Sequence, residues 1–268
     1  MELVVDGHIT YAYTGGKTLD PARPTVVFIH GVLNDHSVWI LQSRWFANHG
    51  WNVLAVDLPG HCRSAGAPPA SVEDAARFVV ALLDAVGIEK AALVGHSFGS
   101  LIALETAARA PDRVTHIALV GTAYPMVVSP ALLESSSTTP MRAIDMVNSF
   151  SHSMLAPPPS SLGPGTWLYG GSRALMRRVL ASNREVNVFN VGFNACNDYA
   201  NGEAAMAAAT CPVLFLLGAA DQMTPPRAAK ALQAKAVSAK TVTVQAGHAL
   251  MSEAPDAVLF ALRDFLGA

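Results

Sequence analysis

One short stretch decides the fold: Gly95-His96-Ser97-Phe98-Gly99. The apolar residues before it (91–94) are typical of a buried strand, and the residues after it (100–110) are typical of a helix. A serine between two glycines at a strand-to-helix junction is the pattern of a sharp turn that exposes a nucleophile. The glycines remove side chains that would collide with the neighbouring strand or helix. The turn also predicts a Phe98 N–H at the helix N-terminus that binds a developing oxyanion.

On both sides of this stretch, short apolar runs alternate with segments of helical spacing. The runs expected to be strands are residues 3–5, 8–13, 25–29, 53–56, 91–94, 114–120, 213–218 and 241–244. Asp6-Gly7 joins the first two as a hairpin turn, and the continuous apolar character of the later runs is typical of strands buried on both faces. The alternation predicts an α/β fold, with a mostly parallel eight-stranded sheet and helices on both faces.

The alternation stops between residues 124 and 210, where little strand signal is present. Helical patterns are expected at residues 141–150, 173–181 and 195–209, and the interruptions are Pro157-Pro158-Pro159 and Gly163-Pro164-Gly165. We therefore expect a helical cap inserted on the sheet. The predicted domains are a core of residues 1–123 and 211–268 and a cap of residues 124–210.

Composition argues against several functional classes. The chain has 268 residues, of which 51% are apolar and 14% charged, and its net charge is −2, so a large core is expected and binding to nucleic acid or an anionic membrane is not. The three cysteines lack metal-ligand spacing and are typical of reduced thiols, and no signal peptide or membrane span is recognised, so a cytoplasmic protein is expected. No spacing of His, Cys, Asp or Glu suggests a metal site and no phosphate-binding glycine pattern is present, so no metal or cofactor is expected. The expected partner is a small-molecule substrate, for a monomer or homodimer.

A serine nucleophile needs a base and an acid, and the sequence offers both. Asp221 follows the expected strand 213–218, and His248 follows the expected strand 241–244. The carboxyl ends of parallel strands form the ligand-binding edge of such a sheet, so the two side chains are expected near Ser97. Ser97, Asp221 and His248 are therefore the predicted catalytic residues.

With these residues, the chain resembles the α/β-hydrolase superfamily, as an esterase-like serine hydrolase with a helical cap after the sixth core strand. The stretches that carry the resemblance are His30-Gly31, Asp57-Leu58-Pro59-Gly60-His61-Cys62-Arg63-Ser64, Gly95-His96-Ser97-Phe98-Gly99, Asp221 followed by Pro225, and Gly247-His248 followed by Glu253 and Pro255. The resemblance implies that the backbone N–H of Val32, with Leu33 as the alternative, joins that of Phe98 in the oxyanion hole. Cys62 departs from the pattern, because the family commonly has glycine there. We interpret Cys62 as a tolerated variation of the loop and not as a nucleophile.

Several other side chains have weaker cases. Six residues are candidates for an apolar substrate pocket: Leu33, Tyr124, Met126, Met146, Phe150 and Trp167. His30 is expected to organise the oxyanion loop by hydrogen bonding. Glu105 is expected on an ordinary helix face, and His152 is expected to be exposed.

The expected reaction is hydrolysis of a small apolar carboxylic ester (EC 3.1.1) through an acyl-enzyme. The same three residues also support a lactonase, an amidase, a C–C bond hydrolase or a perhydrolase. A ligand receptor built on the same fold is a further alternative, since a fold by itself does not decide function.

Overall fold

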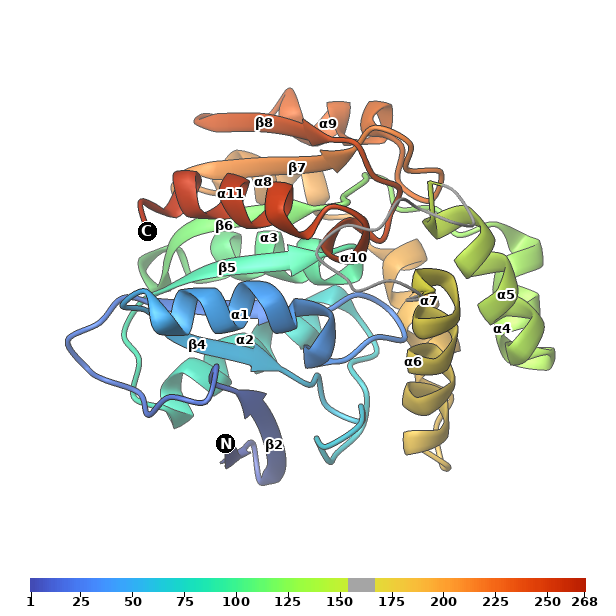
Figure 1. Ribbon diagram of the computed structural model, residues 1–268, viewed down its shortest axis with the longest axis horizontal. Helices are drawn as coiled ribbons and strands as arrows, with labels where there is room; N and C mark the ends of the chain where they lie inside the picture. The colour runs from blue at the N-terminus through green and yellow to red at the C-terminus, as the bar shows by residue number, and fades with distance from the viewer. Residues whose placement is uncertain (154–166) are drawn as a thin grey trace.

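The computed structural model describes residues 1–153 and 167–268. An eight-stranded sheet runs through its centre, with the strand order β1-β2-β4-β3-β5-β6-β7-β8 (Figure 1). The strands are β1 (Glu2–Val5), β2 (His8–Tyr13), β3 (Thr25–Ile29), β4 (Asn52–Val56), β5 (Ala91–His96), β6 (Val114–Val120), β7 (Val213–Gly218) and β8 (Ala239–Val244). Strands β3 to β8 pair in parallel, and β1 and β2 add an antiparallel hairpin at one edge.

Helices cover both faces of the sheet and also lie beyond its carboxyl end (Figure 1). The α-helices are α1 (Ile40–Asn48), α2 (Val72–Ala85), α3 (Phe98–Arg109), α4 (Pro130–Thr138), α5 (Pro140–Ser151), α6 (Leu168–Ser182), α7 (Val188–Asp198), α8 (Gly202–Ala208), α9 (Lys230–Gln233), α10 (Leu250–Glu253) and α11 (Pro255–Leu266). Short 3-10 helices are η1 (His36–Trp39), η2 (Pro111–Arg113) and η3 (Pro226–Ala229). This architecture confirms the predicted fold class.

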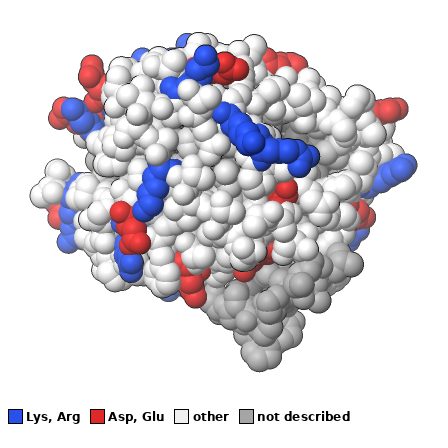
Figure 2. Space-filling model, turned by 90° about the horizontal axis from the view of Figure 1, so that it is seen from above, with Lys and Arg blue, Asp and Glu red and all other residues white. Residues whose placement is uncertain are grey.

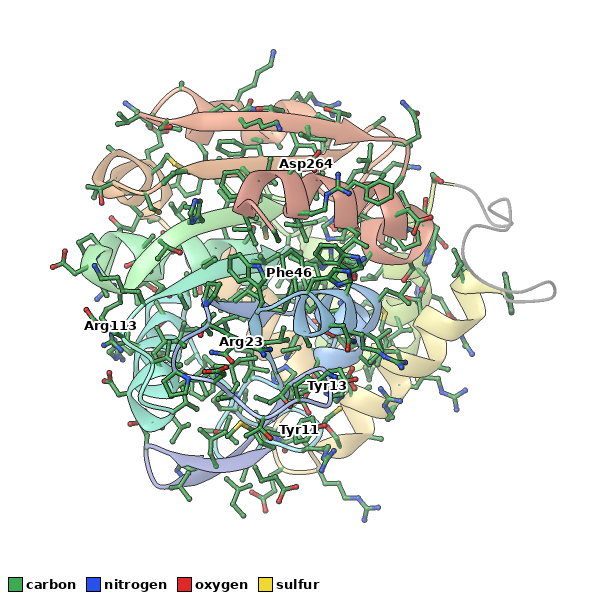
Figure 3. All side chains as sticks on the ribbon, turned by 60° about the vertical axis from the view of Figure 1, so that its left-hand side comes forward. Tyr11, Tyr13, Arg23, Phe46, Arg113 and Asp264 are labelled. Atoms are coloured by element: carbon green, nitrogen blue, oxygen red, sulfur yellow. The ribbon has the colours of Figure 1, made fainter. Side chains whose placement is uncertain are left out.

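The alternation of side chains along each strand divides the core into two layers. In β3, Val26 and Phe28 belong to the apolar cluster under α1 and α11, whereas Val27 and Ile29 belong to the cluster under α2 and α3. Phe46 of α1 is fully buried against Phe28, with ring centroids 5.9 Å apart, and Figure 3 shows it between its helix and the sheet. Strands β3, β4, β5 and β7 are thus buried on both faces, which explains their continuous apolar sequence, whereas the edge strand β8 is mostly exposed.

The inserted helices α4 to α8 lie between β6 and β7 in the chain, and α4 to α7 stand past the carboxyl ends of the strands (Figure 1). The expected helices 141–150 and 173–181 fall within α5 and α6. The expected single helix 195–209 is wrong, because the chain breaks between α7 and α8 at residues 199–201, where Tyr199 and Asn201 bind Glu105 of α3. The Pro-rich and Gly-Pro interruptions expected at residues 157–159 and 163–165 lie outside the described residues.

Helix α4 is absent from the sequence prediction although its start signal is present. The Ser129 side chain accepts a hydrogen bond from the Leu132 N–H, and Pro130 occupies the first helical position. Serine at the N-cap and proline at the next residue are strong helix-start signals. The weakly amphipathic composition of the rest of the helix explains why periodicity does not reveal it.

The surface carries few charges. The face in Figure 2 is mostly uncharged, with small groups of Lys or Arg and of Asp or Glu scattered over it. Among the described residues, no helix combines the length and apolar character that crossing a membrane requires.

Candidate active site

Ser97 occupies a strained turn between β5 and α3. Its backbone has φ 53° and ψ −118°, a conformation that L-residues rarely adopt. A Cβ atom on Gly95 would lie 1.9 Å from the Gly99 carbonyl oxygen, and one on Gly99 would lie 2.4 Å from the Ile29 carbonyl oxygen. The Ser97 N–H donates to the Val120 carbonyl at 2.9 Å, which ties the turn to β6. Only glycine at both flanks allows this approach of strand to helix.

Two buried hydroxyl groups stabilise the turn at Ser97. The Ser100 hydroxyl donates to the Ser97 carbonyl oxygen at 2.5 Å, and Ser100 Oγ lies 2.8 Å from Thr122 Oγ1. Both side chains are fully buried. The bonds fix the carbonyl of Ser97 and so orient the residue. Sequence reasoning missed this pair, since serine and threonine carry no signal of such a role.

Asp221 and His248 form a buried pair. His248 Nδ1 lies 2.8 Å from Asp221 Oδ2, and the Asp221 side chain is fully buried. The Thr224 hydroxyl donates to the same Asp221 oxygen at 2.8 Å and lies 3.0 Å from His248 Nδ1. The N–H groups of Met223 and Thr224 donate to Asp221 Oδ1, each at 2.8 Å. The structure brings the predicted Asp221 and His248 together. The sequence prediction gave no role to Thr224, whose only sequence signal is its place in the turn after Asp221.

The environment of Asp221 keeps the carboxyl group ionised. Burial by itself would raise the pKa of Asp221, but His248 and the hydrogen bonds from Thr224 outweigh burial and lower this pKa to about 2. The ionised carboxylate accepts the Nδ1–H of His248, which leaves Nε2 as the basic atom of the ring. The arrangement therefore holds His248 in the tautomer that a general base requires.

His96 connects the Ser97 turn to the loop that carries His248. Its Nε2–H donates to the His248 carbonyl oxygen at 2.9 Å, and the two ring centroids are 4.7 Å apart. Burial and the nearby His248 lower the pKa of His96 to about 3, so its ring is neutral. The contact sets the position of the histidine loop relative to the turn.

Glu253 joins the same loop to the end of α5. Glu253 Oε2 accepts the Gly247 N–H at 3.0 Å, and Oε1 accepts the Ser153 N–H at 2.9 Å. A Cβ atom on Gly247 would lie 2.6 Å from the Ser151 carbonyl oxygen, so glycine is needed for this contact. The histidine loop is thus held on one side by the sheet and on the other by the cap. The sequence placed Glu253 in a motif without indicating this role.

The predicted oxyanion donors, Val32 and Phe98, lie on two segments that meet at Ser97. Phe98 is the first residue of α3, and the first N–H groups of a helix have no acceptor within that helix. A Cβ atom on Gly31 would lie 3.1 Å from the Ser97 Cβ, so the loop that carries Val32 touches the turn. His30 stabilises this loop, because its Nδ1–H donates to the Gly31 carbonyl at 2.8 Å and its Nε2 accepts the Leu58 N–H at 3.0 Å.

Two cavities open at Ser97. The first has a volume of about 290 Å³ and the second about 240 Å³. Of the predicted pocket residues, Trp167 lines the first cavity, whereas Met126, Met146 and Phe150 line the second. The residues that line both cavities are Val32, Ser97, Phe193, Met223 and His248.

The other two predicted pocket residues are elsewhere. Leu33 lines neither cavity, because its side chain is fully buried in the core cluster with α2 and α3. Tyr124 also lines neither, because its hydroxyl donates to the Ala200 carbonyl oxygen at 2.6 Å and its ring packs against Gly202. In both cases, contacts in the folded protein hold away from the cavities a side chain that the sequence predicted to line the pocket.

Two polar residues are more buried than expected. Glu105 is not on an ordinary helix face: its side chain is fully buried and accepts hydrogen bonds from the Tyr199 hydroxyl at 2.7 Å and the Asn201 amide at 2.9 Å. It therefore links α3 to the cap. The expected exposure of His152 is also wrong, since the residue is only 4% exposed and its ring donates to the Asn148 carbonyl at 3.0 Å.

Cys62 lies in a strained position of the loop after β4 and lines neither cavity at Ser97. Its φ is 45°, in the region that favours glycine. Burial and the nearby Asp35 raise the pKa of its thiol to about 12, and the thiol donates to Asp35 Oδ2 at 3.4 Å. A thiol with this pKa is a poor nucleophile at neutral pH.

Asp35, His36 and Asp57 bring potential metal-ligating atoms within 4.8 Å of one another. The carboxylates and the histidine already have hydrogen-bond partners within the protein, however. Asp57 Oδ1 accepts from the N–H and the ring nitrogen of His36, at 2.9 Å and 2.7 Å, and Asp35 Oδ2 accepts from Arg178 at 2.6 Å. A guanidinium group at this position repels a cation, so the cluster fits a structural network better than a metal site.

Comparisons with known proteins are consistent with this geometry. Residues 24–255 match the family described as alpha/beta hydrolase fold. A pimeloyl-[acyl-carrier protein] methyl ester esterase of Neisseria meningitidis serogroup C is 28% identical over 267 residues, which cover 93% of this chain and 96% of that protein. The solved enol-lactonase from Burkholderia xenovorans LB400 is 22% identical, covers 100% of both chains and has a TM-score of 0.82.

A shorter match has higher identity. The dihydrolipoyllysine-residue acetyltransferase component of the acetoin cleaving system of Cupriavidus necator is 40% identical over 121 residues. That match covers 43% of this chain and only 30% of the relative. The matched segment thus spans less than a third of the length of that relative.

Proposed function

Because the chain belongs to the alpha/beta hydrolase fold family, we propose that this hydrolase cleaves a small apolar carboxylic ester through a Ser97–His248–Asp221 triad. One observation carries the proposal. A buried aspartate orients His248 at 2.8 Å, and His248 lines the same two cavities as Ser97 on its strained turn. This is the combination of nucleophile, base and orienting acid that acyl transfer needs.

The proposed reaction has two steps. His248 Nε2 takes the Ser97 hydroxyl proton as Ser97 Oγ attacks the ester carbonyl, and the N–H groups of Val32 and Phe98 stabilise the oxyanion. The imidazolium then gives its proton to the leaving alkoxide, and an acyl-enzyme forms with release of the alcohol. Water, deprotonated by His248, next attacks the acyl carbonyl and releases the carboxylic acid and free Ser97. Asp221 stabilises the imidazolium in both steps without accepting its proton.

The composition of the site supports an apolar ester. Apolar side chains dominate both cavities in the described part of the chain. The full-length similarity to a methyl ester esterase favours carboxylic ester hydrolysis over amide or C–C bond cleavage.

The test is hydrolysis of p-nitrophenyl butyrate by the wild-type protein and by Ser97→Ala. The wild type is expected to release p-nitrophenol over many turnovers, and Ser97→Ala is expected to lose about 10⁴-fold or more in kcat. Ser149→Ala, which alters an exposed serine of α5 outside both cavity walls, is the matched control and keeps most of the activity. A Ser97→Ala variant with more than about 1% of wild-type kcat would refute the triad. A single turnover with retained product would instead indicate a ligand receptor.

A further inference from the structure

The two cavities share Ser97, but most of the residues in their walls differ. Helix α6 borders only the first cavity, through residues such as Leu175 and Met176. The residues after β6 and helix α4 border only the second, through residues such as Met126 and Leu132. Helix α5 lies between them, with Val147 in the wall of the first cavity and Phe150 in the wall of the second. The two cavities thus separate on either side of α5, and they meet where the reacting carbonyl must lie.

From this division, and resting on the proposed hydrolysis of a small apolar ester, we infer that the substrate is an open-chain, uncharged ester with an apolar group of several carbon atoms on each side of the ester bond. One cavity receives the acyl group, and the other receives the alcohol group. Val32, Phe193 and Met223 border both cavities together with Ser97 and His248, so they surround the ester bond itself.

The sizes of the cavities support two substantial groups. A cavity of about 150 Å³ is large enough to hold a benzene molecule. The first cavity, about 290 Å³, and the second, about 240 Å³, both exceed that size. A methyl ester would leave one of them without an apolar occupant. Each methylene group buried in an open cavity is expected to raise kcat/KM by about fourfold.

The chemistry of the walls supports uncharged groups. Among the described residues, neither cavity has a Lys, Arg, Asp or Glu side chain in its wall. A carboxylate on the substrate would lose its hydration in either cavity without a cation to replace it. Both arms of the substrate are therefore uncharged.

The divergence of the cavities also argues against a cyclic ester. In a lactone, the acyl and alcohol sides are joined in one ring and must leave the carbonyl together. In an open-chain ester, the two sides separate at the carbonyl, which matches two cavities that separate at Ser97. An open-chain ester is the better geometric match.

Two substitutions fill one cavity each. Gly171 of α6 lines the first cavity, and a Cβ atom there would meet nothing within 4 Å, so Gly171→Trp introduces bulk without a backbone clash. Val127 lines the second cavity and is 71% exposed, so Val127→Trp narrows it without disturbing the core. Ala174→Trp, on an exposed position of α6 outside both walls, is the matched control for an added indole.

The experiment measures kcat/KM over a grid of aliphatic esters, with acyl chains from acetyl to octanoyl and alcohols from methanol to octanol, and over γ- and δ-lactones. The wild type is expected to prefer esters that are long on both sides over methyl esters, acetates and lactones by at least tenfold. Gly171→Trp is expected to lose at least tenfold in kcat/KM when the group on one side of the ester bond, either acyl or alcohol, is long. Val127→Trp is expected to show the same loss when the group on the opposite side is long. Ala174→Trp is expected to match the wild type.

The inference is overturned if both cavity variants penalise the same side of the ester, if neither penalises one side selectively, or if methyl esters or lactones are the best substrates. These results still leave Ser97-dependent turnover in place. Failure of the proposed function has a different signature, because the wild type then hydrolyses no ester or Ser97→Ala keeps its activity. That result removes the basis of the inference as well.

Discussion

Replacement of Thr224 by valine removes one hydroxyl group from the Asp221–His248 pair and leaves a side chain of similar size. Thr224 is buried, and its hydroxyl donates to Asp221 Oδ2 at 2.8 Å. In Thr224→Val, the carboxylate keeps its bonds from His248 Nδ1 and from the backbone N–H groups of residues 223 and 224. The variant therefore tests one bond in an otherwise intact arrangement.

The magnitude follows from the charge on the acceptor. A hydrogen bond to a charged group contributes about 1.5–3 kcal/mol, so the free energy of unfolding is expected to fall by that amount at pH 7. The pKa of Asp221 in the folded protein, about 2, lies below the ordinary value of 3.8. Its ionised form therefore stabilises the fold above about pH 4, and this stabilisation is lost as the pH falls toward 2. Loss of about 1.4 kcal/mol of that stabilisation raises the Asp221 pKa by about one unit.

The assay is urea unfolding of wild type and Thr224→Val between pH 7 and pH 2. The difference in unfolding free energy is expected to be largest at pH 7 and to shrink as Asp221 becomes protonated. Thr122→Val is the matched control, since that buried hydroxyl contacts Ser100 and no carboxylate, and its effect is expected not to depend on pH. Equal stability of wild type and Thr224→Val at pH 7, or a difference that is constant with pH, would refute the reasoning. Because the His248–Asp221 bond remains, kcat is expected to fall by less than about tenfold.

Three further predictions follow from the surroundings of the site. Cys62→Gly relieves the strain of the positive φ but loses the hydrogen bond of the thiol, so the free energy of unfolding is expected to change by less than about 1 kcal/mol. Esterase activity is expected to remain. Urea unfolding and initial rates measure the two effects, and complete loss of kcat would contradict this. The pKa of His96 in the folded protein, about 3, is below its ordinary value of 6.5, so below about pH 6.5 the unfolded chain binds a proton that the folded protein does not. The free energy of unfolding is therefore expected to fall by about 1.4 kcal/mol per pH unit below about pH 6.5. In His96→Gln, unfolding between pH 7 and 4 should show this slope reduced by the contribution of about one proton. Arg178→Ala removes the 2.6 Å bond from α6 to buried Asp35 and is expected to raise KM severalfold with little change in kcat. Arg178→Lys and the neighbouring Arg177→Ala are expected to keep the wild-type KM. Equal KM values in all variants would show that this ion pair does not position α6.

Local sequence signals predicted a large part of the core. Continuous apolar runs identified the buried strands, because a parallel sheet covered on both faces excludes polar side chains. The glycines around Ser97 were equally informative, since the close approach at Gly95 and Gly99 leaves no room for a Cβ atom. The cap was predicted less well. Helix α4 is weakly amphipathic, and the break at residues 199–201 depends on hydrogen bonds to Glu105, more than ninety positions away in the sequence.

The sequence by itself determined the order of strands and helices outside the inserted segment, the turn at Ser97, and the residue types of the proposed acid and base. These depend on local conformation and on periodicity, which neighbouring residues specify. Only the tertiary structure decided that Thr224 and Glu253 support the acid and the histidine loop, that Leu33 and Tyr124 lie outside the cavities, and that two cavities meet at Ser97. Those features arise where segments distant in the sequence pack together, and the direction of a side chain at such a contact depends on all of its neighbours at once.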